Sequence, residues 1–188
     1  MPRPPRIAIP GATYHVFARG NRKASIVEDD VDRTALLRLV NDVFVARRWC
    51  CLAYCLMTNH YHVLVETPAD DLSAGMHALN GRYARAFNRR HGWKGHLFEK
   101  RFGCIAAESD FHLLELCRYV VLNPVRVGLC SDPADWRWSS FGASAGFSAP
   151  EPFLDVHRLL SLFGGDAARG RVAYRRFVEN GMEAAKSA

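Results

Sequence analysis

The chain has 188 residues, of which 49% are hydrophobic and 23% charged, as is typical of one globular domain with an appendage. No segment approaches the roughly 20 consecutive apolar residues of a membrane span, and the N-terminus lacks the apolar stretch of a secretory signal, so we expect a cytoplasmic protein without a membrane partner. The formal net charge of +6 favours a polyanionic partner, most simply nucleic acid.

Periodic hydrophobic residues predict strands and helices that alternate along the chain. Asp29-Asp30 gives the first helix an acidic start, Ser109-Asp110 caps the third, and Pro124 is expected to end it. The expected strands cover residues 14–20, 51–57, 60–67 and part of 97–107. The expected helices cover residues 31–48, 72–90 and 109–123.

The order β-α-β-β-α-β-α is that of an α+β fold with a ferredoxin-like or RRM-like antiparallel sheet, which hosts many functions. After residue 141 the composition changes. Residues 142–152 are small and rich in Gly, Ala, Ser and Pro, which predicts a linker, and two further helices are expected at 153–163 and 169–181. We therefore expect a domain of residues 1–141, followed by a linker and basic helical C-terminal extension in residues 142–188.

Two histidines stand one residue apart in the third expected strand, in the segment His60-Tyr61-His62. Side chains at i and i+2 of a strand point to the same face, so the two imidazoles project side by side. Such a pair is half of a site for a divalent metal ion, and an ordinary pair of core or surface histidines is the alternative. We interpret the six cysteines as reduced core thiols, and a zinc site that combines Cys51 and Cys55 with the two histidines is disfavoured because no Cys-x2-Cys spacing is present.

Tyr119 and Asn123 lie one turn apart on the polar stripe of the third expected helix. Two imidazoles and an amide oxygen would make a three-ligand metal site with open positions, and such a metal can polarise a phosphate. A phenol that attacks phosphorus would form a phosphotyrosine. Taken alone, the tyrosine and asparagine are more simply interpreted as a plain surface pair.

Basic and aromatic residues interleave between positions 82 and 101, where seven Lys or Arg residues accompany one acidic residue, Glu99. This pattern suits contact with phosphates and stacking on bases. A second basic cluster occupies residues 169–176.

Five ordered segments together resemble the REP-associated tyrosine transposases, relatives of insertion-sequence transposases in the His-hydrophobe-His (HUH) endonuclease superfamily. The resemblance covers residues 13–181. The segments are Tyr14-His15-Val16 with Arg19-Gly20-Asn21, residues 54–62, residues 95–98 with Arg101-Phe102, residues 119–126, and Trp136-Arg137-Trp138-Ser139-Ser140.

The resemblance implies that His60, His62 and Asn123 bind Mg²⁺ or Mn²⁺ and that Tyr119 is the catalytic nucleophile. It implies cleavage of single-stranded DNA at imperfect hairpins of repetitive extragenic palindromes, through a 5′-phosphotyrosine and a free 3′-OH, in a nucleoid-associated protein. Both a monomer and a dimer are compatible with it. The expected DNA-binding residues are Arg19, Asn21, Arg22, Arg82, Arg85, Arg89, Arg90, Lys100, Arg101, Arg126, Arg171 and Arg175.

The resemblance leaves two positions unexplained, one that departs from the family sequence and one without an assigned role. Thr58 replaces the proline usual in the family, which we expect to change the rigidity of the turn rather than the ligands. His15 belongs to the family pattern without an assigned role, as a partner of a metal ligand or as a core residue. The competing interpretation is a non-catalytic nucleic-acid-binding module or repressor on the same fold, which explains the charge but not the histidine pair, tyrosine and asparagine together.

Overall fold

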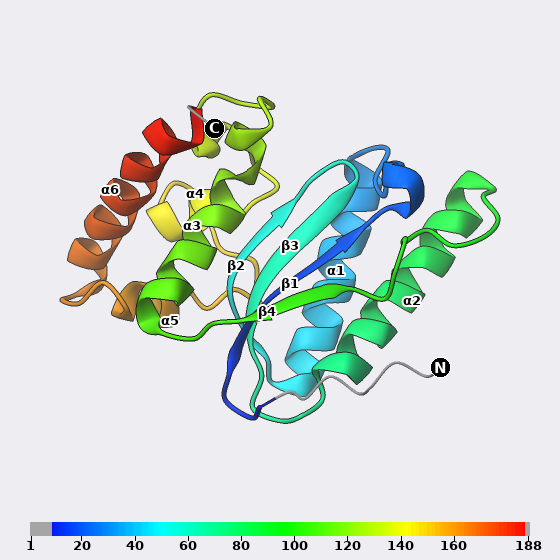
Figure 1. Ribbon diagram of the computed structural model, residues 1–188, viewed down its shortest axis with the longest axis horizontal. Helices are drawn as coiled ribbons and strands as arrows, with labels where there is room; N and C mark the ends of the chain where they lie inside the picture. Colours follow the sequence, from blue (N-terminus) through cyan, green and yellow to red (C-terminus); the bar gives the residue numbers. More distant parts are fainter. Residues whose placement is uncertain (1–8, 187–188) are drawn as a thin grey trace.

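Figure 1 shows the computed structural model, which describes residues 9–186, with side chains described as far as Met182. Four strands form one antiparallel sheet in the order β2-β3-β1-β4. The strands are β1 (Thr13–Arg19), β2 (Cys50–Leu56), β3 (His60–Glu66) and β4 (Gly103–Ala106). The helices are α1 (Asp30–Arg47), α2 (Leu72–His91), α3 (Asp110–Arg126), α4 (Phe141–Ala145), α5 (Val156–Ser161) and α6 (Ala167–Lys186), with 3-10 turns η1 (Asn21–Lys23) and η2 (Pro133–Asp135).

The strand order confirms the expected α+β, ferredoxin-like arrangement, because β1 lies between β3 and β4 as the split β-α-β pattern requires. Helices α1 and α2 cover one face of the sheet, and α3 to α6 lie on the other side (Figure 1). Among the residues that the structure describes, no helix is long and apolar enough to cross a membrane.

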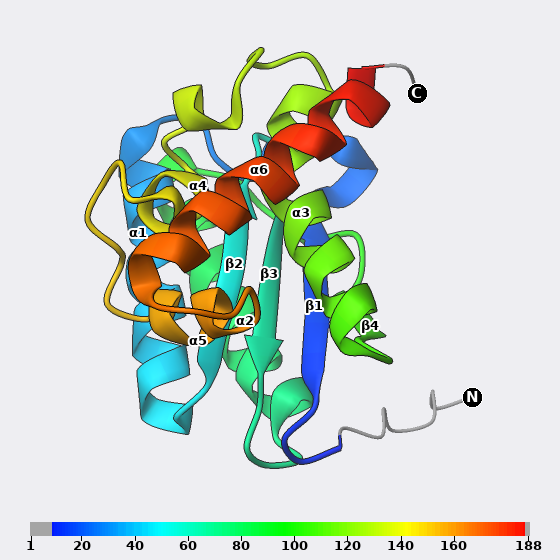
Figure 2. The same cartoon turned by 90° about the vertical axis from the view of Figure 1, so that its left-hand side faces the viewer.

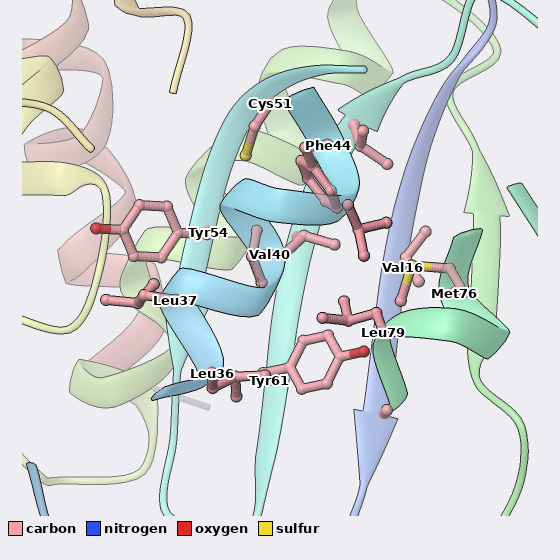
Figure 3. Packing of buried hydrophobic residues seen from close by; sticks show 14 of the residues in the cluster. Val16, Leu36, Leu37, Val40, Phe44, Cys51, Tyr54, Tyr61, Met76 and Leu79 are labelled. Carbon is pink, nitrogen blue, oxygen red and sulfur yellow. The ribbon is translucent and has the colours of Figure 1, made fainter. Parts of the chain in front are cut away.

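The core beneath α1 and α2 takes every second side chain of the central strands. Tyr61, Val63 and Val65 of β3 are fully buried there, while the residues between them point to the opposite face. Leu36 and Phe44 of α1 reach the same core, as Figure 3 shows. Because this face is filled, the two histidines of β3 are directed to the other one.

A second core lies between the sheet and the C-terminal helices. It joins Leu52 and Leu64 of the sheet with Val120 of α3 and with Tyr174 and Val178 of α6, all of them fully buried. Helix α6 lies across α3, as Figure 2 shows. Helix α3 packs on β2 and β3, and the candidate site lies beside it, lined by residues of β1, β3, β4 and α3.

Helix α3 does not end at Asn123 as expected, but continues through Pro124 to Arg126. Proline lacks the N–H that a helix interior needs, and in the last turn this removes one hydrogen bond only. The carbonyl of Pro124 still accepts a hydrogen bond from the N–H of Leu129 at 2.9 Å. The extra turn places Arg126 over the candidate site.

Residues 142–152, expected to form a linker, instead include most of α4, where Ala143, Ser144 and Ala145 are buried. Their small side chains allow α4 to pack closely on its neighbours, including α6, so small size here reflects close packing rather than flexibility. The expected helix at 153–163 is shorter, because α5 covers only residues 156–161. The C-terminal extension is therefore packed on α3 and the sheet.

Candidate active site

The pairing of β1 with β3 determines which side chains share the open face of the sheet. Phe17 lies opposite His62, and Arg19 lies opposite His60. Facing them, α3 presents Tyr119, Asn123 and Arg126 from successive turns. These side chains line a cavity of about 650 Å³, whose other lining residues are His15, Glu99, Lys100, Ile105, Leu116 and Val127.

The hydrogen bonds of Asn59 decide which nitrogen of His60 carries the proton. Its Nδ2 donates to the carbonyl of Lys23 at 3.1 Å, and this acceptor fixes the orientation of the amide. Asn59 Oδ1, which can only accept, lies 2.6 Å from Nδ1 of His60. His60 therefore carries its proton on Nδ1, and the lone pair of Nε2 points toward Asn123, whose Oδ1 lies at 3.3 Å.

The residues present fit a divalent metal ion. Nε2 of His60 and Oδ1 of Asn123 lie 3.3 Å apart, and both atoms could bind one cation placed between them. The separation is near the roughly 3 Å that follows for neighbouring ligands of an octahedral ion with bonds of about 2.1 Å. Nε2 of His62 is buried without a hydrogen-bond partner in the described part of the chain, as expected for an atom that awaits a ligand.

This donor set is two imidazoles and a neutral amide. Across residues 9–186, no group of three or more His, Cys, Asp or Glu residues is placed to hold a metal ion. A metal site here thus depends on the oxygen of Asn123 as third protein ligand, with further positions left for oxygens of phosphate or water.

Burial keeps the histidines of the site in the neutral form that binds metals. It lowers the pKa of His15 to about 4 and the pKa of His62 well below its ordinary value. The pKa of His60 is also lowered, mainly by burial and in addition by the nearby charge of Arg19, while Oδ1 of Asn123, which can accept from the charged ring, acts in the opposite direction. A neutral imidazole offers one nitrogen lone pair, and the hydrogen bonds of the ring determine which nitrogen carries it.

Tyr119 is the one tyrosine whose ring reaches the histidines among the residues that the structure describes. Its centroid lies 5.6 Å from the rings of both His15 and His62, in edge-on geometry. The guanidinium of Arg126 lies over the same ring, 4.9 Å from its centroid. By contrast, Tyr61 and Tyr83 donate their hydroxyls to Asn80 and to the carbonyl of Ile26 inside the other core, so neither is placed to attack a phosphate.

The expected DNA-binding residues divide into two groups. Around the site, Arg19, Lys100 and Arg126 line its cavity. A second groove of about 710 Å³ runs along α2 and the segment 95–102, and Glu99 and Lys100 line both hollows, so the two adjoin. Asn21, Arg85 and Arg101 line this second groove, and Arg22 is exposed beside it in η1 with a left-handed backbone, φ 54°.

The remaining basic residues lie away from both hollows. Arg90 is engaged by Asp29 and Asp32, each at 2.5 Å, and so ties the end of α2 to the start of α1. Arg82 pairs with Asp42 at 3.0 Å on the surface, and Arg89 is exposed. On α6, Arg171 is exposed, and Arg175 stacks on Phe147 with its guanidinium 5.6 Å from the ring centroid.

Sequence reasoning missed the role of Asn59, which stood in a motif without an assigned function, and left His15 open between a partner of a metal ligand and a core residue. It also treated Glu99, which lines the cavity, only as an isolated acid. In the structure, Nε2 of His15 lies 2.8 Å from Nδ1 of His62. A histidine in the first expected strand, next to a strand that carries two, is the signal that could have found this contact.

Comparison with known proteins agrees with the family expected from the motifs. Residues 8–123, more than half of the chain, match the family model described as Transposase IS200 like. A Haemophilus influenzae protein whose name assigns it provisionally to the REP-associated tyrosine transposases is 24% identical over 135 residues, which are 62% of this chain and 77% of that protein. A solved structure of a REP-associated tyrosine transposase bound to a REP hairpin superposes with a TM-score of 0.66 at 20% identity, over 89% of this chain and 93% of that one, which shows the same fold. The chain belongs to the IS200-like transposase family.

Proposed function

We propose that this transposase is a metal-dependent endonuclease and strand transferase that cuts single-stranded DNA beside a hairpin through a 5′-phosphotyrosine. The observation that carries the proposal is one cavity into which His60, His62, Asn123 and Tyr119 converge from β3 and α3. A core histidine pair would not need the unpartnered Nε2 of His62.

In the proposed reaction, one group of residues binds the metal that contacts the phosphate, and Tyr119 attacks the phosphorus. His60, His62 and Asn123 would hold Mg²⁺ or Mn²⁺, which when bound polarises a phosphate and stabilises the charge that develops on it. The phenolic oxygen of Tyr119 forms a bond to phosphorus while the bond to the 3′-oxygen breaks, and a proton passes to that oxygen to leave a 3′-OH. The phosphodiester energy is kept in the phosphotyrosine, so the reverse attack by a 3′-OH rejoins the strand without an external energy source.

Positive side chains give the DNA its path to this cavity. Lys100 lines both hollows, and Arg19 and Arg126 line the site itself, which suits a strand that passes from the second groove into the site. The similar protein in complex with a REP hairpin supports hairpin DNA as the substrate class.

The proposed function is tested by an assay for a covalent adduct between the protein and DNA. Wild-type protein incubated with Mn²⁺ or Mg²⁺ and a hairpin oligonucleotide with single-stranded flanks should form a protein–DNA adduct that survives denaturing electrophoresis. Tyr119→Phe should bind the hairpin and form no adduct. Tyr14→Phe is the matched control, because Tyr14 neighbours His15 in β1 but its side chain lies in the other core, and it should react like wild type.

Each result decides between the two candidate functions. An adduct of undiminished yield in Tyr119→Phe would remove Tyr119 from its role. Wild-type protein that binds the hairpin with either metal but never cuts it would support the non-catalytic module, and cleavage in EDTA would exclude the metal.

A further inference from the structure

A buried pair of imidazoles connects the first strand to the metal-binding residues proposed above. Nε2 of His15 lies 2.8 Å from Nδ1 of His62, and the rings are stacked with centroids 5.0 Å apart and planes inclined by 23°. The two residues are diagonal neighbours across the β1–β3 pair, where Phe17 stands directly opposite His62. His15 is 3% exposed and His62 is 5% exposed, so neither nitrogen of this contact turns to water instead.

Counting protons on this pair shows what His15 controls. Two neutral imidazoles carry one N–H each, and one of these must occupy the short bond between them. If His62 donates from Nδ1, its Nε2 keeps a lone pair that can bind a cation. If His15 donates from Nε2, Nδ1 of His62 accepts and His62 carries its own proton on Nε2. That nitrogen then has no lone pair and cannot bind a cation. The direction of a single hydrogen bond therefore decides whether His62 is a ligand.

We infer that His15 is a positioning residue of the candidate metal site, which accepts the Nδ1–H of His62 and so holds the Nε2 of His62 ready for the metal. The inference rests on the proposed function, since it concerns the same site. Asn59 stands in the same relation to His60, because its Oδ1 accepts from Nδ1 of that ring. Each candidate ligand ring is thus oriented through its far nitrogen by a partner from outside the ligand set.

Packing alone does not account for a histidine at this position. Nδ1 of His15 is buried without a hydrogen-bond partner within the described residues, and an unsatisfied buried polar atom has a cost that an apolar side chain would avoid. A residue selected only to fill the space beside Tyr119 would be apolar. The imidazole of His15 supplies an acceptor for the Nδ1–H of His62. The backbone of β1 cannot do so, because its hydrogen bonds are made to β3 and β4.

The experiment measures binding of Mn²⁺ alone to the full-length protein without DNA, by the electron paramagnetic resonance signal of free Mn²⁺. Four proteins are compared: wild type, His15→Leu, His15→Gln and Thr13→Val. Leucine keeps the bulk without the acceptor, and the amide of glutamine can place an acceptor near the position of Nε2. Thr13 is a buried polar residue on the same strand and face, two positions away, and serves as the matched control.

We expect His15→Leu to bind Mn²⁺ about 10- to 100-fold more weakly than wild type, His15→Gln to recover part of the loss, and Thr13→Val to match wild type. Imidazole ¹⁵N spectra of the wild type with diamagnetic Mg²⁺ should show His62 protonated on Nδ1. The spectra need no variant, so they test the inference even if the leucine variant does not fold.

Three results overturn the inference while leaving the proposed function in place. They are wild-type Mn²⁺ affinity in folded His15→Leu, equal losses in the leucine and glutamine variants, and a His62 proton on Nε2 in the Mg²⁺-bound wild type. A wild-type protein that binds neither Mn²⁺ nor Mg²⁺ would instead overturn the metal site itself, and the inference with it.

Discussion

At the scale of single residues, the candidate site depends on how protons and lone pairs are distributed among buried groups. His60 is oriented by Asn59, and the neutral state of His62 follows from its burial. Each neutral ring carries one nitrogen lone pair, and the hydrogen-bond partner of the ring determines which nitrogen holds it.

Removal of either ring should abolish metal-dependent cleavage with little effect on the fold. We expect His60→Ala and His62→Ala each to lower the Mn²⁺-dependent cleavage rate of a hairpin oligonucleotide by more than about 100-fold, since loss of a ligand exceeds the effect of losing its partner. His157→Ala, which changes an exposed histidine of α5, is the control. Circular dichroism should show all three variants folded, and wild-type cleavage in either site variant would contradict the metal assignment.

Local rules were enough to predict the two pairs of residues in the site, but not how the pairs meet or what supports them. The spacing i, i+2 placed His60 and His62 on one face, and i, i+4 placed Tyr119 with Asn123. The expectation that the two pairs share one site came from the resemblance to the transposase family. The contact of His15 with His62 spans 47 positions and depends on the register of β1 against β3. Register is a property of the assembled sheet, which a local pattern does not contain.

At the scale of elements, the long helices and the strands could be predicted because the spacing of hydrophobic residues can be read from each short segment by itself. The end of α3 and the presence of α4 could not be predicted in this way. Pro124 indicates a helix end in isolation, yet its ring is buried within the last turn of α3. Ala143 and Ala145 resemble linker residues, yet they pack α4 into the core of the protein. In both cases tertiary packing overrides the local preference.

The contact of α2 with the Trp49 ring gives an element-scale prediction. A Cβ on Gly75 would lie 2.2 Å from a ring carbon of Trp49, whose Nε1 is held by Asp71 at 2.8 Å. Gly75→Ala should therefore destabilise the protein by about 1–3 kcal/mol through overpacking. Gly81→Ala in the same helix, where the nearest atom is the flexible end of Arg85 at 3.4 Å, should stabilise it by about 0.5–1 kcal/mol. Urea unfolding of both variants measures the difference, and a neutral Gly75→Ala would contradict the described packing.

At the scale of the whole molecule, the C-terminal extension is part of the second core. Tyr174 and Val178 of α6 are fully buried together with Val120 of α3. The helix that carries the candidate nucleophile is thus held between the sheet and α6. The position of Tyr119 depends on the extension even though no described residue of α6 lines the site cavity.

Truncation after residue 141 should consequently impair folding rather than reveal a regulatory tail. Without α6 the outer face of α3 would expose side chains that are fully buried in the intact chain, so we expect aggregation or a broad thermal transition. Size-exclusion chromatography and circular dichroism would show this. A truncated protein that is monomeric, melts cooperatively and cuts DNA would instead establish that residues 1–141 fold alone.

The charge of the molecule can be tested in the second groove, along α2 and the segment 95–102. Arg85→Gln and Arg101→Gln should each weaken hairpin binding and flatten the dependence of log Kd on log salt by about 0.7 for each phosphate of a single strand that the variant no longer neutralises. Sequence preference should survive, because phosphate contacts position the DNA and base contacts specify it. Arg90 is unsuitable for this test, since neutralising it would leave the buried carboxylate of Asp32 without its arginine.

Arg171→Gln on α6 provides the comparison in these titrations. Because Arg171 does not line either hollow, we expect a smaller change in the salt dependence than at Arg85 or Arg101. A change of equal size would show that the DNA extends over α6 and that the extension clamps it. Binding that does not respond to salt, or equal affinity for plain duplex and hairpin, would contradict the assignment of the basic grooves to single-stranded and hairpin DNA.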